Sequence, residues 1–195
     1  MKALLSILIG LARFIAKPIV MLAYRKREAI DPLAVCWLYL VPQRIFLINF
    51  STPWPVDFRS KVTFPKRIQV GRRSFPGISP GCYIAARNGI VIGDNFRSGP
   101  NVGLVSANHA VDDYEKHLET PPITIGDNVW IGMNSTVLPG INIGDNVIIG
   151  AGSVVTRDIP SNSIAVGHPC KVIREKTPYI GELKGKTYGL KDLQK

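Results

Sequence analysis

Apolar and polar positions in the middle of the chain repeat with a period of six residues. The tetrapeptide Ile-Gly-Asp-Asn occurs three times, beginning at Ile92, Ile125 and Ile143. From Ile125 a six-residue frame continues without a slip, and its first position is always aliphatic: Ile125, Ile131, Val137, Ile143, Ile149 and Val155. The fifth position is small or β-branched: Val129, Ser135, Ile141, Val147, Ser153 and Ile159. Internal repetition of this kind is the strongest structural signal in the sequence.

This period fits neither an α-helix nor a simple strand. It fits a coil with three flat faces, each one hexad long, so that Ile125 and Ile143, 18 residues apart, lie one full turn from each other. The glycine at the second position is expected to permit the sharp corner. Each coil buries its aliphatic side chains only against neighbouring coils, so stability is collective. A β-sandwich would explain the Val and Ile content but not the fixed frame, and the pattern therefore predicts an all-β parallel β-helix.

One polar segment interrupts the repeat. Ile92 and Ile125 are 33 residues apart, which is one coil plus 15 residues, and the excess falls in residues 106–121. This segment predicts a loop that leaves the β-helix between two regular coils, where chemistry is expected. Earlier coils are less regular, with these candidate inward residues: Val70, Ile78, Ile84 and Ile92.

The beginning of the chain has a different pattern. Residues 3–12 and 18–24 are almost entirely apolar, but Arg13 and Lys17 interrupt them, so the stretch falls short of the roughly 18 uninterrupted apolar residues of a spanning helix. On a helix the polar and small residues would fall within about 80° of arc: Lys2, Ser6, Gly10, Arg13 and Lys17. Such a narrow cationic stripe favours a helix lying in a membrane interface.

Further charge follows this segment, because Arg25, Lys26 and Arg27 would attract anionic lipid. A helix packed on the protein's own core or in an oligomer contact is the alternative, and a signal peptide is disfavoured by the poor cleavage signature. Residues 33–50 continue apolar and predict a second interfacial helix that Pro42 would kink. We therefore expect an appendage over residues 1–57, the β-helix over 58–174 and a tail over 175–195.

Charge and cysteine content narrow the setting of the protein. The formal net charge of +10 indicates an anionic partner. No aromatic-interleaved basic patch or nucleic-acid motif is present, so nucleic-acid binding is not expected. Cys36, Cys82 and Cys170 form no CxxC pair and are odd in number, so neither a disulfide framework nor a zinc site is indicated. We expect reduced cysteines and a cytoplasmic protein, peripheral to the inner face of the membrane.

The repeat and its flanking motifs resemble the hexapeptide-repeat acyltransferases over residues 70–174. The resemblance rests on Pro-Asn-Val at Pro100, Asn-His-Ala-Val-Asp-Asp at Asn108, Pro-Ile-Thr-Ile-Gly-Asp-Asn-Val-Trp-Ile-Gly at Pro122, and the segments 150–160 and 167–174. It is similar to the maltose and galactoside O-acetyltransferase branch. The Pro- and aromatic-rich residues 57–68 and the hydrophobic start look more like colanic-acid and exopolysaccharide acetyltransferases.

This resemblance implies a left-handed β-helix, a homotrimer with active sites between adjacent β-helices, and acetyl-CoA as donor without a metal. His109 stands at the family's catalytic position, and an imidazole is largely free base at neutral pH. Asp112 or Asp113 would orient the base, by the logic of catalytic dyads. The backbone N–H of Met133 would stabilise the oxyanion.

Other positions match residues that contact CoA in the family: Ala151, Thr156, Arg157, Lys171 and Arg174. Surface-charge roles stay open for Arg157 and Arg174. Trp130 precedes an inward residue and should point outward, where it would wall the acyl site or pack at a subunit interface.

The acceptor is the least determined part of the prediction. Asn88 and His117 are candidate acceptor contacts, whereas His168, in a Gly-x-Pro turn, is expected to be structural. A lipid-seeking start suits a membrane-held glycan, so we expect O-acetylation of a cell-surface polysaccharide precursor. A soluble sugar or serine acetyltransferase, an N-acyltransferase of an amino-sugar nucleotide and a non-enzymatic scaffold are the alternatives. The histidine spacing does not match the metal-binding trio of carbonic-anhydrase-like β-helices.

Overall fold

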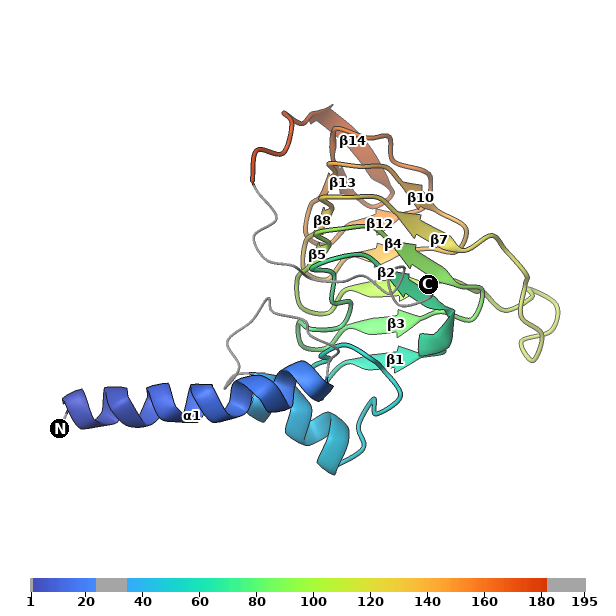
Figure 1. Cartoon of the computed structure of the whole chain (residues 1–195). Coiled ribbons are helices and arrows are strands. Elements are labelled where there is room, and N and C mark those ends of the chain that lie inside the picture. The colour runs from blue at the N-terminus through green and yellow to red at the C-terminus, as the bar shows by residue number, and fades with distance from the viewer. Residues whose placement is uncertain (1, 24–34, 182–195) are drawn as a thin grey trace, which may run out of the picture.

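The repeat forms a left-handed parallel β-helix of triangular section in the computed structural model, which describes residues 2–23 and 35–181 (Figure 1). Three sheets make its faces in this described part. Face A contains β1 (Lys61–Thr63), β3 (Tyr83–Ala85), β6 (Gly103–Val105), β9 (Thr136–Val137) and β12 (Val154–Val155). Face B contains β2 (Ile68–Val70), β4 (Ile90–Ile92), β7 (Ile123–Ile125) and β10 (Asn142–Ile143). Face C contains β5 (Arg97–Ser98), β8 (Trp130–Ile131), β11 (Ile148–Ile149), β13 (Ser163–Gly167) and β14 (Cys170–Glu175).

We number the coils from one to five, each beginning with its face A strand: β1, β3, β6, β9 and β12. The end at β1 is called the base. The last strand, β14, turns back antiparallel to β13 and closes face C at the far end. Gly167, the last residue of β13, has a positive φ of 102°, and the His168–Pro169 peptide that follows it is cis. This is the turn in which we expect a structural role for His168.

The register confirms the six-residue frame. Ile92, Ile125 and Ile143 stand beside one another on face B, so the 33-residue interval is one coil plus the predicted loop. All the first-position and fifth-position residues of the frame are buried, none more than 7% exposed. Among the earlier candidates Val70, Ile84 and Ile92 are fully buried and Ile78 packs partly against the core. The core is therefore one continuous aliphatic stack along the axis.

The expectation that glycine makes the corner was wrong. Gly126 and Gly132 do not have positive φ; instead the left-handed corner residue is the asparagine of each Gly-Asp-Asn, with φ of 58° at Asn95, 56° at Asn128 and 58° at Asn146. Glycine is required because coils approach closely. A Cβ on Gly126 would lie 2.8 Å from the Asp145 backbone nitrogen, and one on Gly132 would lie 2.5 Å from the Ala151 nitrogen. Asparagine tolerates the left-handed region better than most residues.

The aspartate of each corner ties neighbouring coils together. Asp127 Oδ1 accepts the N–H of Asp94 at 2.6 Å, and Asp145 Oδ1 accepts the N–H of Asp127 at 2.7 Å. The asparagines pair as well, since Asn95 Nδ2 donates to Asn128 Oδ1 at 2.9 Å. Backbone N–H groups that a turn would leave unpaired are thereby satisfied.

An appendage covers the base. The helix α1 (Lys2–Ala23) extends past the β-helix (Figure 1). The π-helix η1 (Cys36–Ile45), which contains Pro42, packs against α1. The short 3₁₀-helix η2 (Pro65–Arg67) joins β1 to β2. No described helix is long and apolar enough to cross a membrane. The side chains of Lys2, Arg13 and Lys17 and all of Arg25, Lys26 and Arg27, which carry the predicted charge, lie outside the described residues.

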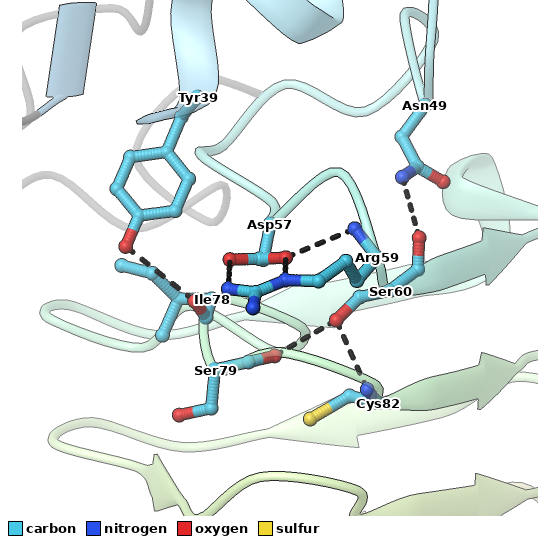
Figure 2. A network of polar contacts seen from close by, with 8 residues as sticks. All are labelled: Tyr39, Asn49, Asp57, Arg59, Ser60, Ile78, Ser79 and Cys82. Atoms are coloured by element: carbon cyan, nitrogen blue, oxygen red, sulfur yellow. Dashed lines mark hydrogen bonds and ion pairs between the residues drawn. The ribbon is translucent and has the colours of Figure 1, made fainter. Parts of the chain in front are cut away.

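Polar contacts fix η1 and the following segment to the base coil (Figure 2). Tyr39 Oη donates to the Ile78 carbonyl at 3.5 Å, and Asn49 Nδ2 donates to the Ser60 carbonyl at 2.8 Å. The buried Gln43 bridges the Trp54 carbonyl and the Val56 N–H, both at 3.2 Å. Trp54 and Val56 also belong to the same buried cluster as the coils. The appendage therefore has a defined orientation relative to the β-helix, while the domain boundary near residue 57 stays a prediction.

Ser60 and the ion pair beside it complete this junction. Ser60 Oγ donates to the Ser79 carbonyl at 2.8 Å and accepts the Cys82 N–H at 3.0 Å. Asp57 binds Arg59 through two hydrogen bonds of 2.9 and 3.0 Å. Burial opposes ionisation of Asp57, but the bonds and charge of Arg59 outweigh it and lower its pKa. Cys82 and Cys170 are both buried and free.

The close approach of coils predicts a specific stability defect. Gly126→Ala should lower the free energy of unfolding by about 1–3 kcal/mol, the usual cost of forcing extra atoms into a packed interior. Thermal or urea unfolding measures the loss. Gly10→Ala is the control, because a Cβ there meets no atom within 4 Å. Equal losses in the two variants would contradict the clash.

Candidate active site

The polar segment 106–121 leaves the β-helix where face A meets face B, between β6 and β7, and projects away from the body (Figure 1). It folds back on itself as an antiparallel ladder. The Ala110 N–H donates to the Lys116 carbonyl at 2.9 Å, and the Leu118 N–H donates to the Asn108 carbonyl at 2.8 Å. This ladder brings His109 opposite His117. Their ring centroids are 4.2 Å apart.

The His109 ring is exposed, and its Nδ1 contacts the backbone carbonyl of Tyr114. A carbonyl oxygen can only accept, so we assign the ring proton to Nδ1. In the neutral imidazole this leaves Nε2 with a lone pair that can take a proton from a bound hydroxyl. The loop thus presents a base of defined tautomer.

The orienting group at Nδ1 is therefore a carbonyl and not the predicted carboxylate of Asp113. Asp113 is committed elsewhere: its Oδ2 lies 3.1 Å from Lys116 Nζ, and its Oδ1 accepts the Glu115 N–H at 3.1 Å. The tight turn at residues 113–116 directs its carboxylate towards the loop's own backbone. Asp112 is exposed, and its orienting role stays a prediction.

His117 packs against His109, a contact that its sequence position did not reveal. Burial, the charge of Arg87 and that of His109 lower the pKa of His117. The lowered pKa disfavours a second positive charge beside His109.

Asn88 anchors the loop. Its Nδ2 donates to the Leu118 carbonyl at 2.8 Å and to Thr120 Oγ1 at 2.9 Å, while its own N–H donates to Ser106 Oγ at 2.9 Å. Both ends of the loop are thus tied to the preceding coil. Asn88 was expected to contact the acceptor; the structure shows that it holds the loop that carries His109.

The remaining candidate residues are spread over two edges and one face of the β-helix. Thr156 and Arg157 follow β12 and share the edge between faces A and B with the loop. Met133 and Ala151 lie on the edge between faces C and A, where they follow β8 and β11. Trp130, on face C, points outward as expected and is 54% exposed. Lys171 and Arg174 are exposed in β14. One chain therefore does not bring His109 and Met133 together.

The edge between faces C and A is open to solvent at residues 151 and 152. Gly152 has a φ of 69°, and a Cβ built on it meets no atom within 4 Å. Ala151 beside it is exposed, and Met133 is 46% exposed. Small residues at an open corner let a ligand approach the backbone closely. Over the described residues, no group of three His, Cys, Asp or Glu side chains that could hold a metal ion was found.

Similarity to known proteins agrees with this architecture. Residues 122–157 match the family described as the hexapeptide repeat of succinyl-transferase. The galactoside O-acetyltransferase of Escherichia coli is 44% identical over 116 residues, covering 58% of this chain and 56% of that protein. A maltose O-acetyltransferase from Clostridium difficile is 32% identical, with a TM-score of 0.59, over 88% of this chain and 89% of that one. The chain belongs to the hexapeptide-repeat acyltransferases.

A second structural relative of this family member is a galactoside acetyltransferase solved in complex with coenzyme A. It is 31% identical, has a TM-score of 0.59 and covers 90% of this chain and 88% of that one. The sequence alignments are shorter than the structural ones. They span about half the length of the curated relatives, between 43% and 56% of the relative's chain for three of them. The resemblance of residues 57–68 to colanic-acid acetyltransferases stays a prediction.

Sequence reasoning about this family member did not single out four residues that the structure places beside His109 or in a pocket. The Tyr114 carbonyl acts through backbone, which no motif encodes. Arg73, Arg97 and Tyr179 line a pocket on face C. One signal was available for Arg73: the first coil reads Gly-Arg-Arg where later coils read Gly-Asp-Asn.

Anchoring by Asn88 can be tested through loop mobility. Asn88→Asp removes both amide donors, so trypsin should cut at Lys116 several-fold faster while the β-helix stays intact. Timed proteolysis with mass spectrometry measures the rate. Asn108→Asp makes the same charge change at an exposed residue of the same loop and should leave it unaltered; faster cutting in both variants would argue against anchoring by Asn88.

Proposed function

We propose that this chain is an acetyl-CoA-dependent O-acetyltransferase that acts on a sugar hydroxyl. The observation that carries the proposal is the exposed His109 ring, whose Nδ1 is held by the Tyr114 carbonyl, so that Nε2 is left to accept a proton. Nε2 removes the hydroxyl proton as the oxygen attacks the thioester carbonyl carbon. The tetrahedral intermediate then expels the CoA sulfur, which receives the proton from the imidazolium, so the ester forms and the base is regenerated.

The Met133 N–H is the proposed oxyanion donor. Among the described residues it has no hydrogen-bond acceptor. The N–H groups of Gly132 and Gly152, in contrast, donate to backbone carbonyls of neighbouring coils. A backbone donor serves this role whatever the side chain is. Methionine therefore does not argue against the assignment.

Assembly as a homotrimer would join the two edges. His109 lies on the edge between faces A and B, while Met133 and Ala151 lie on the edge between faces C and A, and these edges bound opposite sides of face A. A rotationally symmetric oligomer places one edge of each copy against a different edge of the next. The proposed site is thus shared between neighbouring copies.

Acetyl-CoA would lie on the upper coils. Ala151 and Gly152 are exposed, with open space beside Gly152, so the pantetheine arm could approach the backbone there. Arg157, Lys171 and Arg174, all exposed, provide cations for its phosphates. The CoA complex of the structurally similar galactoside acetyltransferase supports this choice of donor.

The reaction is tested with acetyl-CoA and a panel of sugar, glycan and amine acceptors. His109→Ala should lower kcat by about 10²–10⁴-fold, the usual contribution of a general base, with little change in CoA binding. His168→Ala, at an exposed histidine outside the loop, is the control and should retain activity. Undiminished turnover in His109→Ala would refute the base, and preferred transfer to amines would replace O- with N-acetylation.

We further propose that the base of the β-helix rests on the inner face of the cytoplasmic membrane. Large apolar side chains of α1 are exposed, with Phe14 at 78% and Ile7 at 67%. The segment from η1 onward adds Trp37 at 72%, and more apolar side chains follow it: Ile45, Phe46, Leu47 and Phe50. Surfaces of this extent are unusual on a protein in water. Arg44 stands among them. Its guanidinium donates to the carbonyls of Phe50 and Thr52, and its positive charge would attract anionic headgroups.

Such docking suits an acceptor that is itself held at the membrane. A lipid-linked precursor of a cell-surface polysaccharide carries its sugars just above the headgroups. The polar contacts of Figure 2 would keep the coils at a set height above that surface. The third coil, which carries His109, stands two coil spacings above the first, or about 10 Å.

Vesicle sedimentation tests the membrane surface. The full chain should pellet with phosphatidylglycerol–phosphatidylethanolamine vesicles, and Phe14→Glu combined with Trp37→Glu should weaken binding about tenfold or more, because burial of two large apolar side chains is lost. Ile180→Glu is the control, since Ile180 is 96% exposed on the C-terminal segment. Equal binding by all three proteins would argue that another surface, or none, meets lipid.

A further inference from the structure

A pocket of about 350 Å³ lies on face C, outside the residues assigned to His109 and CoA chemistry except for Trp130. Three cations line it: Arg73, Arg97 and Lys176. Trp130 and Tyr179 supply aromatic walls, and none of the described lining residues is acidic. The volume falls within the range of small-molecule sites. Its charge and aromatic walls suit a ring that carries an anionic group.

Arg73 occupies a position where the fold prefers another residue. It is the left-handed corner residue of the first coil, with a φ of 54°, at the place held by Asn95, Asn128 and Asn146 in the next three coils. A non-glycine side chain other than asparagine or aspartate is uncommon in this region. Backbone strain of this kind collects at functional sites. Asparagine would adopt this corner conformation with less strain than arginine. What arginine adds at this position is its guanidinium group.

Arg97 joins the same pocket from the second coil. Its Nη1 donates to the Arg73 carbonyl at 3.4 Å, which places the two arginines side by side. Burial, and then the charge of Arg73, lower the pKa of Arg97. Arg97 also stands directly beside Trp130 in the register of face C.

The C-terminal segment completes the pocket. Lys176 Nζ contacts Asn146 Oδ1, and the backbone N–H of Lys176 donates to the Asn162 carbonyl at 2.9 Å. Asn146 Nδ2 in turn donates to the Thr177 carbonyl at 3.1 Å. Corner asparagines therefore pin this segment to the edge between faces B and C. Tyr179 follows two residues later and lines the pocket, with Lys176 Nζ 5.8 Å from its ring centre.

Height along the axis separates this pocket from the proposed donor site, and face C, on which the pocket lies, also borders the edge that carries Met133. The proposed CoA contacts Ala151, Thr156 and Arg157 lie on the fourth and fifth coils, and His109 and Met133 belong to the third. Arg73 and Arg97 belong to the first and second. Donor residues thus lie on one side of the reacting level, and the pocket's arginines lie on the other, towards the base.

We propose that this pocket binds an anionic group, a phosphate or a carboxylate, carried by the sugar acceptor, with Arg73 and Arg97 as specificity-determining residues. The proposal rests on the acetyltransferase function above and narrows its substrate class to anionic glycans. The sugar ring would stack on Trp130, and the guanidinium groups would pair with its anion.

A matched pair of acceptors tests the pocket: p-nitrophenyl glucuronide and p-nitrophenyl glucoside, which differ by one carboxylate. Arg97→Gln should raise the KM for the glucuronide about tenfold or more, the effect of losing a charge-assisted hydrogen bond. The KM values for the glucoside and for acetyl-CoA should not change. Lys66→Gln makes the same charge change at an exposed residue outside the pocket and is the control. Polyprenyl phosphoglucose in micelles distinguishes a phosphate from a carboxylate preference.

Arg73→Asn separates function from folding. It restores the corner residue of the other coils, so its thermal stability should equal or exceed that of the parent while glucuronide affinity falls. Calorimetric binding of the glucuronide keeps the test independent of turnover. Binding that depends on Arg97 without transfer to any acceptor would refute the proposed reaction and support the pocket. An unchanged KM for the glucuronide, or a raised KM for acetyl-CoA instead, would overturn the pocket's assignment.

Discussion

Close stacking of coils is the constraint on which the rest of this structure depends. Backbone hydrogen bonds between coils require adjacent turns to approach within bonding distance along all three faces, which leaves no room for a Cβ at Gly126 or Gly132. The sharp turn itself falls to asparagines with positive φ, and aspartates pair with the N–H groups of the coil before. Once these corners are in place, the aliphatic stack forms without choice of register, because a slip would bury polar corners.

Rigidity of this kind explains why the proposed catalytic base lies outside the regular coils. A regular prism offers flat faces and little concavity, so a reactive side chain needs a segment that leaves the frame. The loop 106–121 provides that departure, and Asn88 and the His109–His117 ladder give it order of its own. The proposed site is nevertheless divided, with the proposed base and the proposed oxyanion donor on different edges. That division favours an assembly in which neighbouring copies complete each other's sites.

The residues of the proposed activity follow one another along the axis of the β-helix. The exposed apolar base contains Phe14 and Trp37, the middle coil carries His109, and the last strands carry Lys171 and Arg174. An acceptor approaching from a lipid surface and a soluble donor approaching from the far end would then meet at the third coil. The arginines of face C lie on the acceptor's side of that level, as an anionic acceptor requires.

Repetition in the sequence was sufficient to predict the β-helix, its inward residues and the loop, because each hexad carries the same local demand and neighbouring coils satisfy it. The loop histidine was predictable from its motif. Only the tertiary structure decided that Asn rather than Gly turns the corner, that Tyr114 and not Asp113 meets His109 Nδ1, and that Arg73 lies near Tyr179. These depend on backbone direction and on contacts between coils distant in sequence, which no local pattern encodes.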